Sequence, residues 1–347
     1  MSARSTLAKL LGDNVQCWFE GDDFCYRVPR GGLSPALRSS VAAEKTALRA
    51  YMGEGKKFTR ASYAQESLWF VEQSASGQPL LTIPWFSFEM EGELDIEALE
   101  TALFDVVERH ESLRTHFQRV DDVLAQVVTP AAPIRLRRSD LAHLSGSQQA
   151  EAIRQTALEA VCAPFDLAAG PLFHVHLVVL GPGHHLLIAP IHHIISDGWS
   201  MGVLFRDLYN AYSARAAKRP PEWNPLPITY AQYSQGQRCL SDESARSRLL
   251  AYWRAALAGY PTRIDFPGIR PAFHTGDNSG AEYVFPFPKD LSHRLKSFSN
   301  RQGVSLFMTL LAGFEALLHR YSGQDRFTVG GGGANRPGPG LAGLIRY

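Results

Sequence analysis

The spacing of hydrophobic positions changes several times along the first 52 residues. Apolar residues recur at helical intervals over residues 7–11 and 37–48, and two β-prone runs, 15–19 and 24–28, lie between them. A Gly-Asp-Asp turn separates the two runs, so we expect a hairpin there. The Ser-Pro pair at residues 34–35 is a helix start signal, because serine caps a helix and proline fits its first turn. The pattern predicts a helix, a hairpin and a second helix.

Beyond residue 57, helical and strand patterns alternate. Residues 95–109 place apolar side chains on one face of a helix, and residues 203–212 do so again. Between them, the apolar runs 177–180 and 186–188 flank a Gly-Pro-Gly turn and predict a pair of strands. Alternation of this kind is typical of an α/β or α+β fold.

The length of 347 residues suits two or three folded units. Residues 53–57, Gly-Glu-Gly-Lys-Lys, are interpreted as a linker. We call residues 1–52 the head and residues 58–347 the body, and we divide the body into residues 58–225 and 226–347. A head of this size, taken as a self-contained unit, buries only a small core, so we expect it to dimerise or to bind a partner.

The charges of the chain nearly cancel, with 35 Lys and Arg against 34 Asp and Glu and a net charge of +1. This balance supplies no bulk attraction to nucleic acid or to an anionic membrane. No apolar run approaches the about 20 residues of a membrane-spanning helix, and residues 1–14 do not have the pattern of a signal peptide. The four cysteines are widely spaced, which argues against a disulfide framework and fits a reducing cytoplasm. We expect a cytoplasmic protein without a nucleic acid or membrane partner.

The head carries a group of basic residues in its hairpin and helices. They are Arg27, Arg30, Arg38 and Lys45. One interpretation is a solvated basic face. The other is a receptor surface for an acidic peptide, added as a strand to the edge of the hairpin.

The second predicted strand of the body runs directly into Ile-His-His-Ile-Ile-Ser-Asp-Gly at residues 191–198. Side chains alternate across a strand, so only one of His192 and His193 can face a given cavity. Asp197 lies in the following turn, where a carboxylate organises backbone amides or pairs with a cation. Gly198 permits a turn that a residue with a Cβ would resist. For either histidine alone, a packed or exposed side chain is the ordinary interpretation.

No metal or cofactor site is expected from the sequence. The histidine pairs 184–185 and 192–193 fall at the two ends of one extended strand, too far apart to share an ion. The four glycines at residues 330–333 lack the Lys-Ser or Lys-Thr that completes a phosphate-binding loop.

Two segments of the head carry a resemblance to a known family. They are Val-x-x-Trp-x-Glu-Gly-Asp over residues 15–22 and Tyr-Arg-x-Pro-x-Gly-x-Leu-Ser-Pro over residues 26–35. Together they resemble the N-terminal docking domain of the tubulysin-synthetase type, found at the start of assembly-line subunits. The resemblance implies a homodimeric αββαα fold that captures the C-terminal tail of the upstream subunit. The basic residues of the head would then be docking residues.

The body resembles another family over residues 58–347. His-His-x-x-x-Asp-Gly is similar to the signature of nonribosomal peptide synthetase condensation domains, which have a chloramphenicol-acetyltransferase-like fold of two subdomains. The two parts of the body would be these subdomains. Five further segments match family motifs in order and spacing: Ser62-x-Ala64-Gln65-x-x-Leu68-Trp69, Arg109-His110-Glu111-x-Leu113-Arg114-Thr115-x-Phe117, Pro164-Phe165-Asp166-Leu167-x-x-Gly170-Pro171-Leu172, Tyr230-Ala231-Gln232-Tyr233, and Val329-Gly330 with Ala334-Asn335-Arg336.

The sequence departs from the family pattern at three places outside the signature. Ser67 stands where arginine is usual, Gln232 stands where aspartate is usual, and residues 330–333 replace a stretch that usually contains proline. The signature itself differs from that of heterocyclising relatives, and the extra histidine-rich motif of dual epimerising relatives is not seen. The resemblance therefore implies the amide-forming class.

The resemblance implies acyl transfer from a donor carrier protein to the amine of an acceptor carrier protein. The 4′-phosphopantetheine arms belong to these carriers, and the chain would bind no cofactor. The catalytic set would be His193, His192, Asp197 and Gly198, with His193 central, either as general base or as a group that positions the amine. We expect Asp197 to be architectural through an ion pair with Arg336, or with Arg114 as the second candidate.

Two other functions stay open. One is a free-standing acyltransferase that uses His-x-x-x-Asp to esterify an alcohol. The other is a catalytically impaired remnant that only docks or binds, because the family continues after Leu344-Ile345 with glycine and a Phe-Val-Asn strand where this chain has Arg346 and Tyr347. A cloned fragment, a frameshift or a split subunit would explain this difference. In each case the second subdomain is incomplete, and we expect it to expose apolar surface and strand edges.

Overall fold

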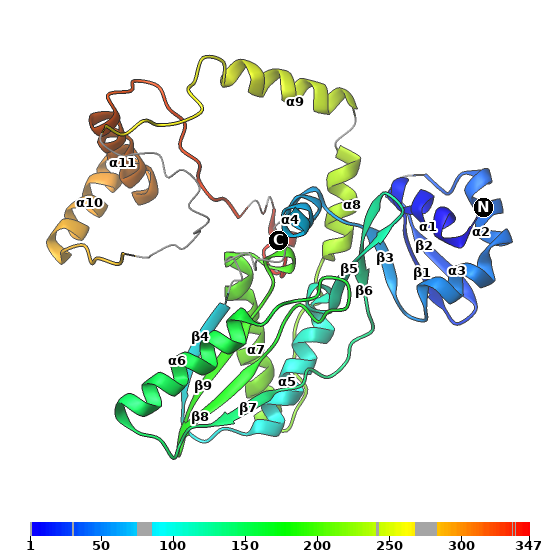
Figure 1. The fold of residues 1–347 in the computed structure, drawn as a ribbon, viewed down its shortest axis with the longest axis horizontal. Helices are drawn as coiled ribbons and strands as arrows, with labels where there is room; N and C mark the ends of the chain where they lie inside the picture. The colour runs from blue at the N-terminus through cyan, green and yellow to red at the C-terminus, as the bar shows by residue number, and fades with distance from the viewer. Residues whose placement is uncertain are drawn as a thin grey trace. The chain divides into compact units, whose positions relative to one another are not determined.

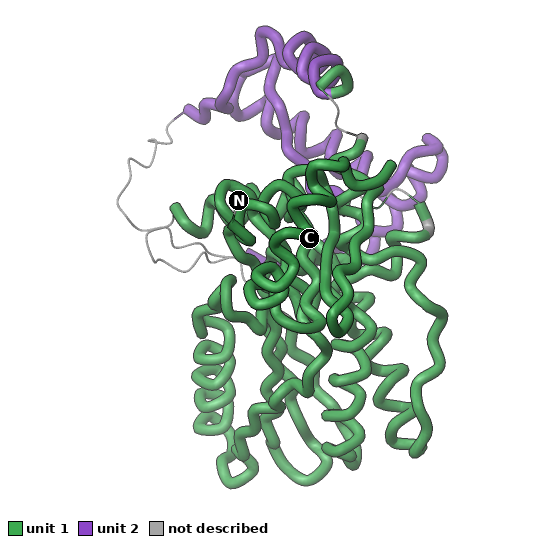
Figure 2. The backbone as a smooth tube through the Cα atoms, turned by 90° about the vertical axis from the view of Figure 1, so that its right-hand side faces the viewer, with its two compact units in different colours: residues 1–245, 334–347 green, residues 246–333 purple. Residues whose placement is uncertain are grey.

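The computed structural model describes residues 2–29, 31–74, 85–240, 243–267, 283–334, 336 and 338–347. The chain divides into two compact units, coloured separately in Figure 2. Unit 1 comprises Met1–Ala245 and Ala334–Tyr347, and unit 2 comprises Arg246–Gly333. The boundary that we expected at residues 225–226 thus lies within unit 1, since the chain beyond it still packs there.

The head follows the expected order of a helix, a hairpin and further helical structure. Its elements are α1 (Ala3–Gly12), β1 (Gln16–Glu20), β2 (Asp23–Arg27), α2 (Pro35–Ala43) and α3 (Lys45–Met52). Ser34 caps α2 by accepting a hydrogen bond from the backbone N–H of Leu37 at 3.3 Å. The hydrophobic pattern predicted one helix to residue 52, whereas the structure has a break between α2 and α3 at Glu44.

The head and the body share one sheet and one core. The sheet has the strand order β2-β1-β3-β6-β5, where β3 is Lys57–Arg60, β5 is Thr115–Val120 and β6 is Val123–Val128. Strand β1 pairs antiparallel with β3, Cys17 opposite Phe58, and Leu48 of the head is buried in the same cluster as Phe58 and Val127. The head is therefore not self-contained, and Lys57 lies in a strand instead of a linker. The hairpin covers the edge of β3 that β6 leaves open.

A second sheet carries the His-His segment. Its order is β4-β9-β8-β7, with β4 (Trp85–Glu91), β7 (Arg137–Asp140), β8 (His176–Gly181) and β9 (His184–Pro190), and only β7 and β8 are parallel. Helix α6 (Gly146–Cys162) covers one face, and α5 (Ile96–Arg109) and α7 (Gly198–Ala216) cover the other (Figure 1). Strand β9 alternates accordingly, since Leu186 and Ile188 face α6 whereas Leu187 and Ala189 face the larger core.

The other described elements of unit 1 are helices and short 3₁₀ turns. They are α4 (Tyr63–Ser74), α8 (Tyr230–Leu240) and the 3₁₀ turns η1 (Glu111–Arg114), η2 (His193–Ile195) and η3 (Pro339–Leu341). Turn η2 contacts α4, and the segment 334–347 returns to unit 1.

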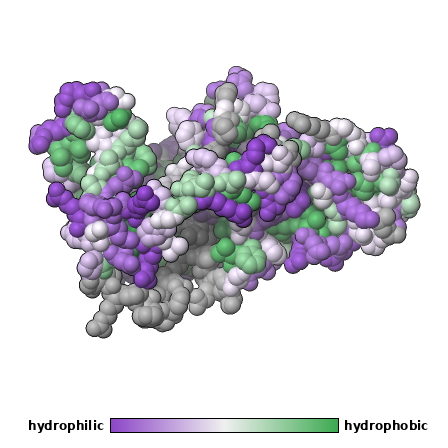
Figure 3. Space-filling view, turned by 90° about the horizontal axis from the view of Figure 1, so that it is seen from above, coloured by the Kyte–Doolittle hydropathy of each residue, from purple (hydrophilic) through white to green (hydrophobic). Residues whose placement is uncertain are grey.

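Unit 2 exposes apolar side chains on its helices. It contains most of α9 (Glu243–Ala256), together with α10 (Lys289–Gln302) and α11 (Leu306–Ser322). No residue of α9 or α11 is buried, and Trp253, Phe307 and Phe314 are 55, 64 and 49% exposed. Figure 3 shows apolar surface in green over α10 and α11, at the left of the view. The expected apolar surface is present, whereas the described part of unit 2 contains no strand.

No single described helix is long and apolar enough to cross a membrane. Helices α10 and α11 reach that length and composition only as a pair, and the pair is bent by 105°.

Candidate active site

The 3₁₀ turn η2 at the end of β9 presents His193 with one ring nitrogen fixed. Its Nδ1 lies 2.8 Å from the backbone oxygen of Ser196. A carbonyl oxygen can only accept, so Nδ1 carries the proton and Nε2 of the neutral ring is an acceptor. The described residues give Nε2 no hydrogen-bond partner, and the ring of Tyr347 lies edge-on with a centroid distance of 4.9 Å. His193 therefore has a basic nitrogen available to a substrate.

His192 is fixed in the opposite tautomer. Its Nδ1 accepts the backbone N–H of Ile194 at 3.0 Å, so Nε2 carries the proton and donates to Oε1 of Glu72 at 2.9 Å. Burial lowers the pKa of His192 and so favours the neutral ring, although Glu72 has the opposite effect and raises that pKa. The strand alternation that we expected at these residues does not apply, because β9 ends at Pro190 and His193 lies in η2. The two histidines differ instead in their partners: His192 is buried and bonded to Glu72, whereas Nε2 of His193 has no hydrogen-bond partner among the described residues.

Glu72 is the site residue that the sequence analysis missed. It lies on α4, three residues after Trp69, the last residue of the first family motif. An acidic residue one turn beyond that motif is a weak signal, because only the tertiary contact between α4 and η2 gives it a partner.

Polar residues of the first and fourth family motifs also support the turn of His193. The side chain of Gln65 donates from Nε2 to the backbone oxygen of Ile194 at 3.3 Å, and its Oε1 accepts the backbone N–H of Ser62 at 3.0 Å. The hydroxyls of Ser62 and Tyr230 lie 2.8 Å apart, and Tyr230 also donates to the backbone oxygen of Tyr347 at 3.1 Å. Burial raises the pKa of Tyr230, so this phenol stays protonated as a donor.

Asp197 is the N-cap of α7. Its Oδ1 accepts hydrogen bonds from the backbone N–H of Ser200 at 2.7 Å and from the Ser200 hydroxyl at 2.6 Å. The same oxygen lies 2.7 Å from Nη2 of Arg336, whose side chain is 5% exposed. Arg336 Nη1 donates to the backbone oxygens of Leu341 and Leu344 at 2.9 and 2.6 Å. The structure thus brings Asp197 and Arg336 together and joins the segment 334–347 to α7.

Arg114, the second candidate partner of Asp197, is engaged elsewhere. Its guanidinium donates to the backbone oxygens of Val107 and Thr129 and lies 3.8 Å from Glu111. These contacts hold it between α5 and the end of β6, so the alternative pairing with Asp197 is wrong.

Gly198 is the first residue of α7, and its backbone does not need the freedom of glycine. Its φ is not positive, and an added Cβ would meet no atom within 4 Å. The expected turn is therefore made by the Asp197 cap, not by an unusual conformation of Gly198. Gly198 borders a cavity of about 450 Å³, which is also lined by Trp199, Gly202, Val203, Arg206, Ala342 and Gly343.

A buried carboxylate ties α7 to the second family motif. Asp207 Oδ2 lies 2.8 Å from Nε2 of His110 and 2.9 Å from Nε of Arg109, and its Oδ1 lies 2.9 Å from Nε of Arg206. Burial would raise the pKa of Asp207, but the hydrogen bonds from His110, Arg206 and Arg109 outweigh it and lower the pKa to about 2. Helix α7, which begins just after the turn of His193, is therefore held in its middle by the charged hydrogen bonds of Asp207.

The structure places the predicted docking residues on separate elements of the head. Arg27 lies at the end of β2, Arg38 on α2 and Lys45 at the start of α3, and all three are exposed. Arg30 lies outside the described residues. Arg49 of α3 is paired within the head, with Asp22 and Glu54.

Among the described residues, no group of three or more His, Cys, Asp or Glu side chains could hold a metal ion. The amide, hydroxyl, imidazole and carboxylate groups near His193 hydrogen-bond to one another. Such an arrangement is suited to fixing one imidazole next to a substrate.

Comparisons with known proteins identify the family of the chain. The family model described as Condensation domain matches residues 56–345. One of the linear gramicidin synthase subunits of Brevibacillus parabrevis is 37% identical over 286 residues, which are 82% of this chain and 6% of that protein. Chondramide synthase cmdD of Chondromyces crocatus is 37% identical over 289 residues, which are 82% of this chain and 7% of that protein. The chain thus spans a small part of these curated relatives.

Solved structures share the fold at lower identity. The SgcC5 protein from Streptomyces globisporus has a TM-score of 0.65 at 24% identity, over 83% of this chain and 66% of that one. A structure on condensation domain-mediated chain release from the enacyloxin polyketide synthase has a TM-score of 0.60 at 22% identity, over 100% of this chain and 70% of that one. The second alignment includes the head, which the family model leaves out.

Proposed function

The chain belongs to the condensation-domain family, and from this premise we propose that it joins a donor acyl or peptidyl thioester to the α-amine of an aminoacyl thioester. Condensation domains of nonribosomal peptide synthetases form peptide bonds in assembly lines for secondary metabolites. They work on substrates carried by the phosphopantetheine arms of partner carrier proteins and bind no cofactor of their own. The donor and acceptor carriers are the proposed partners of this chain.

The observation that carries the proposal is the free Nε2 of His193. The amine attacks the thioester carbonyl, a C–N bond forms, the C–S bond breaks, and the amine loses one proton while the thiolate gains one. Nε2, held as an acceptor by the Nδ1 contact to Ser196, is placed to accept that hydrogen as a hydrogen bond or as a proton. The first mode positions the amine and the second is general-base catalysis, and both need the same unprotonated atom.

The proposed roles of the other site residues are architectural. His192 and Glu72 hold the turn that carries His193, and Asp197 with Arg336 holds the start of α7 and the segment that follows Ala334. Gly198 keeps the space beside this helix start open.

The test combines this chain with donor-loaded and acceptor-loaded carrier proteins and measures the amide by mass spectrometry. We expect product with the unchanged chain and a rate about 10²–10⁴-fold lower for His193→Ala. The control is His143→Ala, since His143 is an exposed histidine of unit 1. Condensation that survives in His193→Ala, with His143→Ala unchanged, would overturn the choice of residue.

One alternative function has an observation in its favour. The described helices of unit 2 have almost no buried side chains, which suits a chain that binds carriers or docks without efficient catalysis. In the same assay this alternative predicts no amide above a protein-free control, although the chain still binds a carrier in a pull-down.

We further propose that the head is a docking element for the C-terminal tail of an upstream subunit, through Arg27, Arg30, Arg38 and Lys45. Support comes from the exposure of the three described cations, from β2 as an edge strand, and from the αββαα order. Fluorescence anisotropy with a labelled acidic tail peptide tests it. Binding should weaken in Arg27→Gln and Arg38→Gln but not in Arg154→Gln, an exposed arginine of α6 that is paired with Glu151. Equal loss in all three variants would indicate unspecific charge attraction. Light scattering of the chain tests the proposed homodimer.

A further inference from the structure

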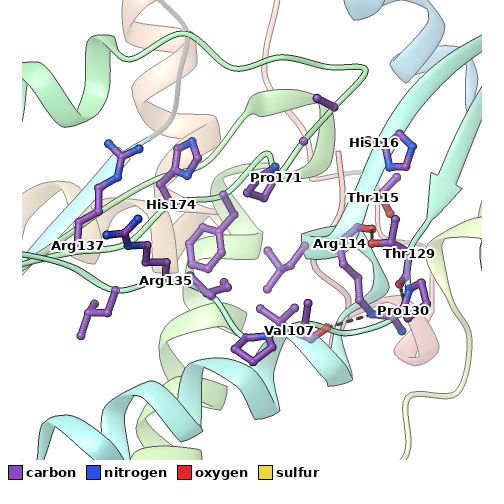
Figure 4. Close-up of a pocket in the computed structure, with 18 of the residues that line it drawn as sticks. Val107, Arg114, Thr115, His116, Thr129, Pro130, Arg135, Arg137, Pro171 and His174 are labelled. Atoms are coloured by element: carbon purple, nitrogen blue, oxygen red, sulfur yellow. Dashed lines mark hydrogen bonds between the residues drawn. The ribbon is translucent and has the colours of Figure 1, made fainter.

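A cavity of about 1000 Å³ lies in unit 1, apart from the active-site residues. It is bounded by the end of α5, by η1 and the start of β5, by the segment between β6 and β7, and by the segment before β8 (Figure 4). His193, Asp197 and Gly198 do not line it. Its lining includes six basic or histidine side chains and no carboxylate: Arg114, His116, Arg135, Arg137, Arg138 and His174.

Two of these charges are already compensated. Arg138 donates to Glu100 at 2.6 Å, and Arg114 is held by two backbone oxygens with Glu111 nearby. Figure 4 shows the Arg114 side chain turned toward Val107 and Thr129, with both hydrogen bonds dashed.

Arg135 and Arg137 are not compensated. Both are exposed, and no described carboxylate pairs with either of them. Figure 4 shows the two guanidinium groups on the same side of the cavity as His174. Arg137 is close enough to His174 to add to the effect of burial, which lowers the pKa of that histidine. The cavity therefore combines two free positive charges with a neutral imidazole that is able to donate one N–H.

The floor of the cavity is apolar. Leu113, Phe173 and Leu136 line it and are buried. A volume of this size accommodates a small organic molecule, and a guanidinium fork matches the oxygens of a phosphate group. A single carboxylate would leave one of the two arginines unpaired, whereas a diphosphate offers each of them its own oxygens.

We propose that this cavity binds a phosphate-bearing small molecule, with its phosphate oxygens on Arg135 and Arg137 and its organic body over Phe173 and Leu136. The site is separate from the proposed amide-forming site, and neither carrier proteins nor activity are needed to observe it.

The test is isothermal titration calorimetry of the whole chain with pyrophosphate at low salt. We expect one site per chain, with the affinity reduced about tenfold in Arg135→Gln and in Arg137→Gln, as for the loss of one charged hydrogen bond. Arg154→Gln is the matched control, because it removes an exposed arginine of α6 that pairs with Glu151 and does not line the cavity. Its affinity should stay near that of the unchanged chain.

Each possible result decides the matter. The absence of binding, or an equal loss in Arg154→Gln, would overturn the proposal, and succinate binding as tightly as pyrophosphate would overturn the choice of phosphate. Thermal melting of each variant shows whether it is folded, and Arg137→Lys keeps the charge without the fork. An intermediate affinity in that variant supports the guanidinium contact, and full affinity contradicts it.

Discussion

The turn that carries His193 and the sheet between head and body are held in different ways, although both belong to unit 1. At the turn, Asp197 and Arg336 are bound through a few short polar contacts. In the shared sheet, Leu48 and Phe58 fill a common apolar core. Polar contacts of the first kind depend on charge and on the position of single atoms, whereas apolar burial depends on area and volume. Changes at the turn should affect pH dependence and activity, and changes in the sheet should affect the stability of head and body together.

The largest effect is expected at the turn. Asp197→Ala leaves Arg336 buried without its anion and removes the cap of α7, so we expect a loss of about 3 kcal/mol in the free energy of unfolding. Urea denaturation followed by circular dichroism measures it. Asp122→Ala is the control, because the Asp122 side chain is 98% exposed.

A double-mutant cycle sharpens this prediction. If the two charges act on each other, the double variant Asp197→Ala with Arg336→Ala should lose less free energy of unfolding than the two single variants lose together. An Asp197→Ala variant with normal stability and no activity would contradict the architectural role and move Asp197 into the chemistry.

A comparable effect is expected in the sheet, with a different signature. Leu48 is fully buried in α3, and Leu48→Ala should lower the free energy of unfolding by about 3 kcal/mol. Because the core is shared, head and body should still unfold in one transition, seen with probes in both parts. Thr46→Ala, exposed on the same helix, is the control. Two separate transitions, with only the head shifted, would contradict the shared core.

The same contrast explains what the sequence could predict. Local patterns place the hairpin, α5, β8 and β9, and motif resemblance selects His193, Asp197 and Arg336. These features depend on neighbouring residues or on a known spacing. The join between Cys17 and Phe58 could not be predicted, because any open strand edge offers the same backbone groups. The contact between Glu72 and His192 could not be predicted either, since it spans 120 positions and exists only after α4 packs on η2.

A smaller effect is expected from the carboxylate that anchors α7, and it depends on pH. The pKa of Asp207 falls from its ordinary 3.8 to about 2 on folding, because its hydrogen bonds outweigh burial. A lowered pKa stabilises the folded state above the unfolded value, and this contribution is lost as the pH falls from 3.8 to about 2. The contribution at neutral pH is about 2 kcal/mol.

Asp207→Asn removes this titration. Urea denaturation at several pH values should therefore show a steeper loss of stability on acidification for the unchanged chain than for the variant. Parallel curves would contradict the assignment of the lowered pKa to Asp207. A Leu48→Ala chain should keep the steep acid dependence, because that substitution leaves Asp207 and its hydrogen-bond partners in place.

The smallest effect is expected from the contact that holds His192. Glu72→Ala removes the acceptor of the His192 Nε2–H and loosens the turn that carries His193, so amide formation should fall about tenfold. The free energy of unfolding should fall by about 1 kcal/mol, because a buried donor loses its partner. Glu72→Gln keeps an oxygen acceptor and should restore most of the rate. Without the carboxylate, which raises the pKa of His192, that pKa should fall further, and histidine NMR would detect the shift. An unchanged rate in Glu72→Ala would show that the contact between Glu72 and His192 does not orient His193. The contact between Asp197 and Arg336 would then be the polar contact that positions the turn.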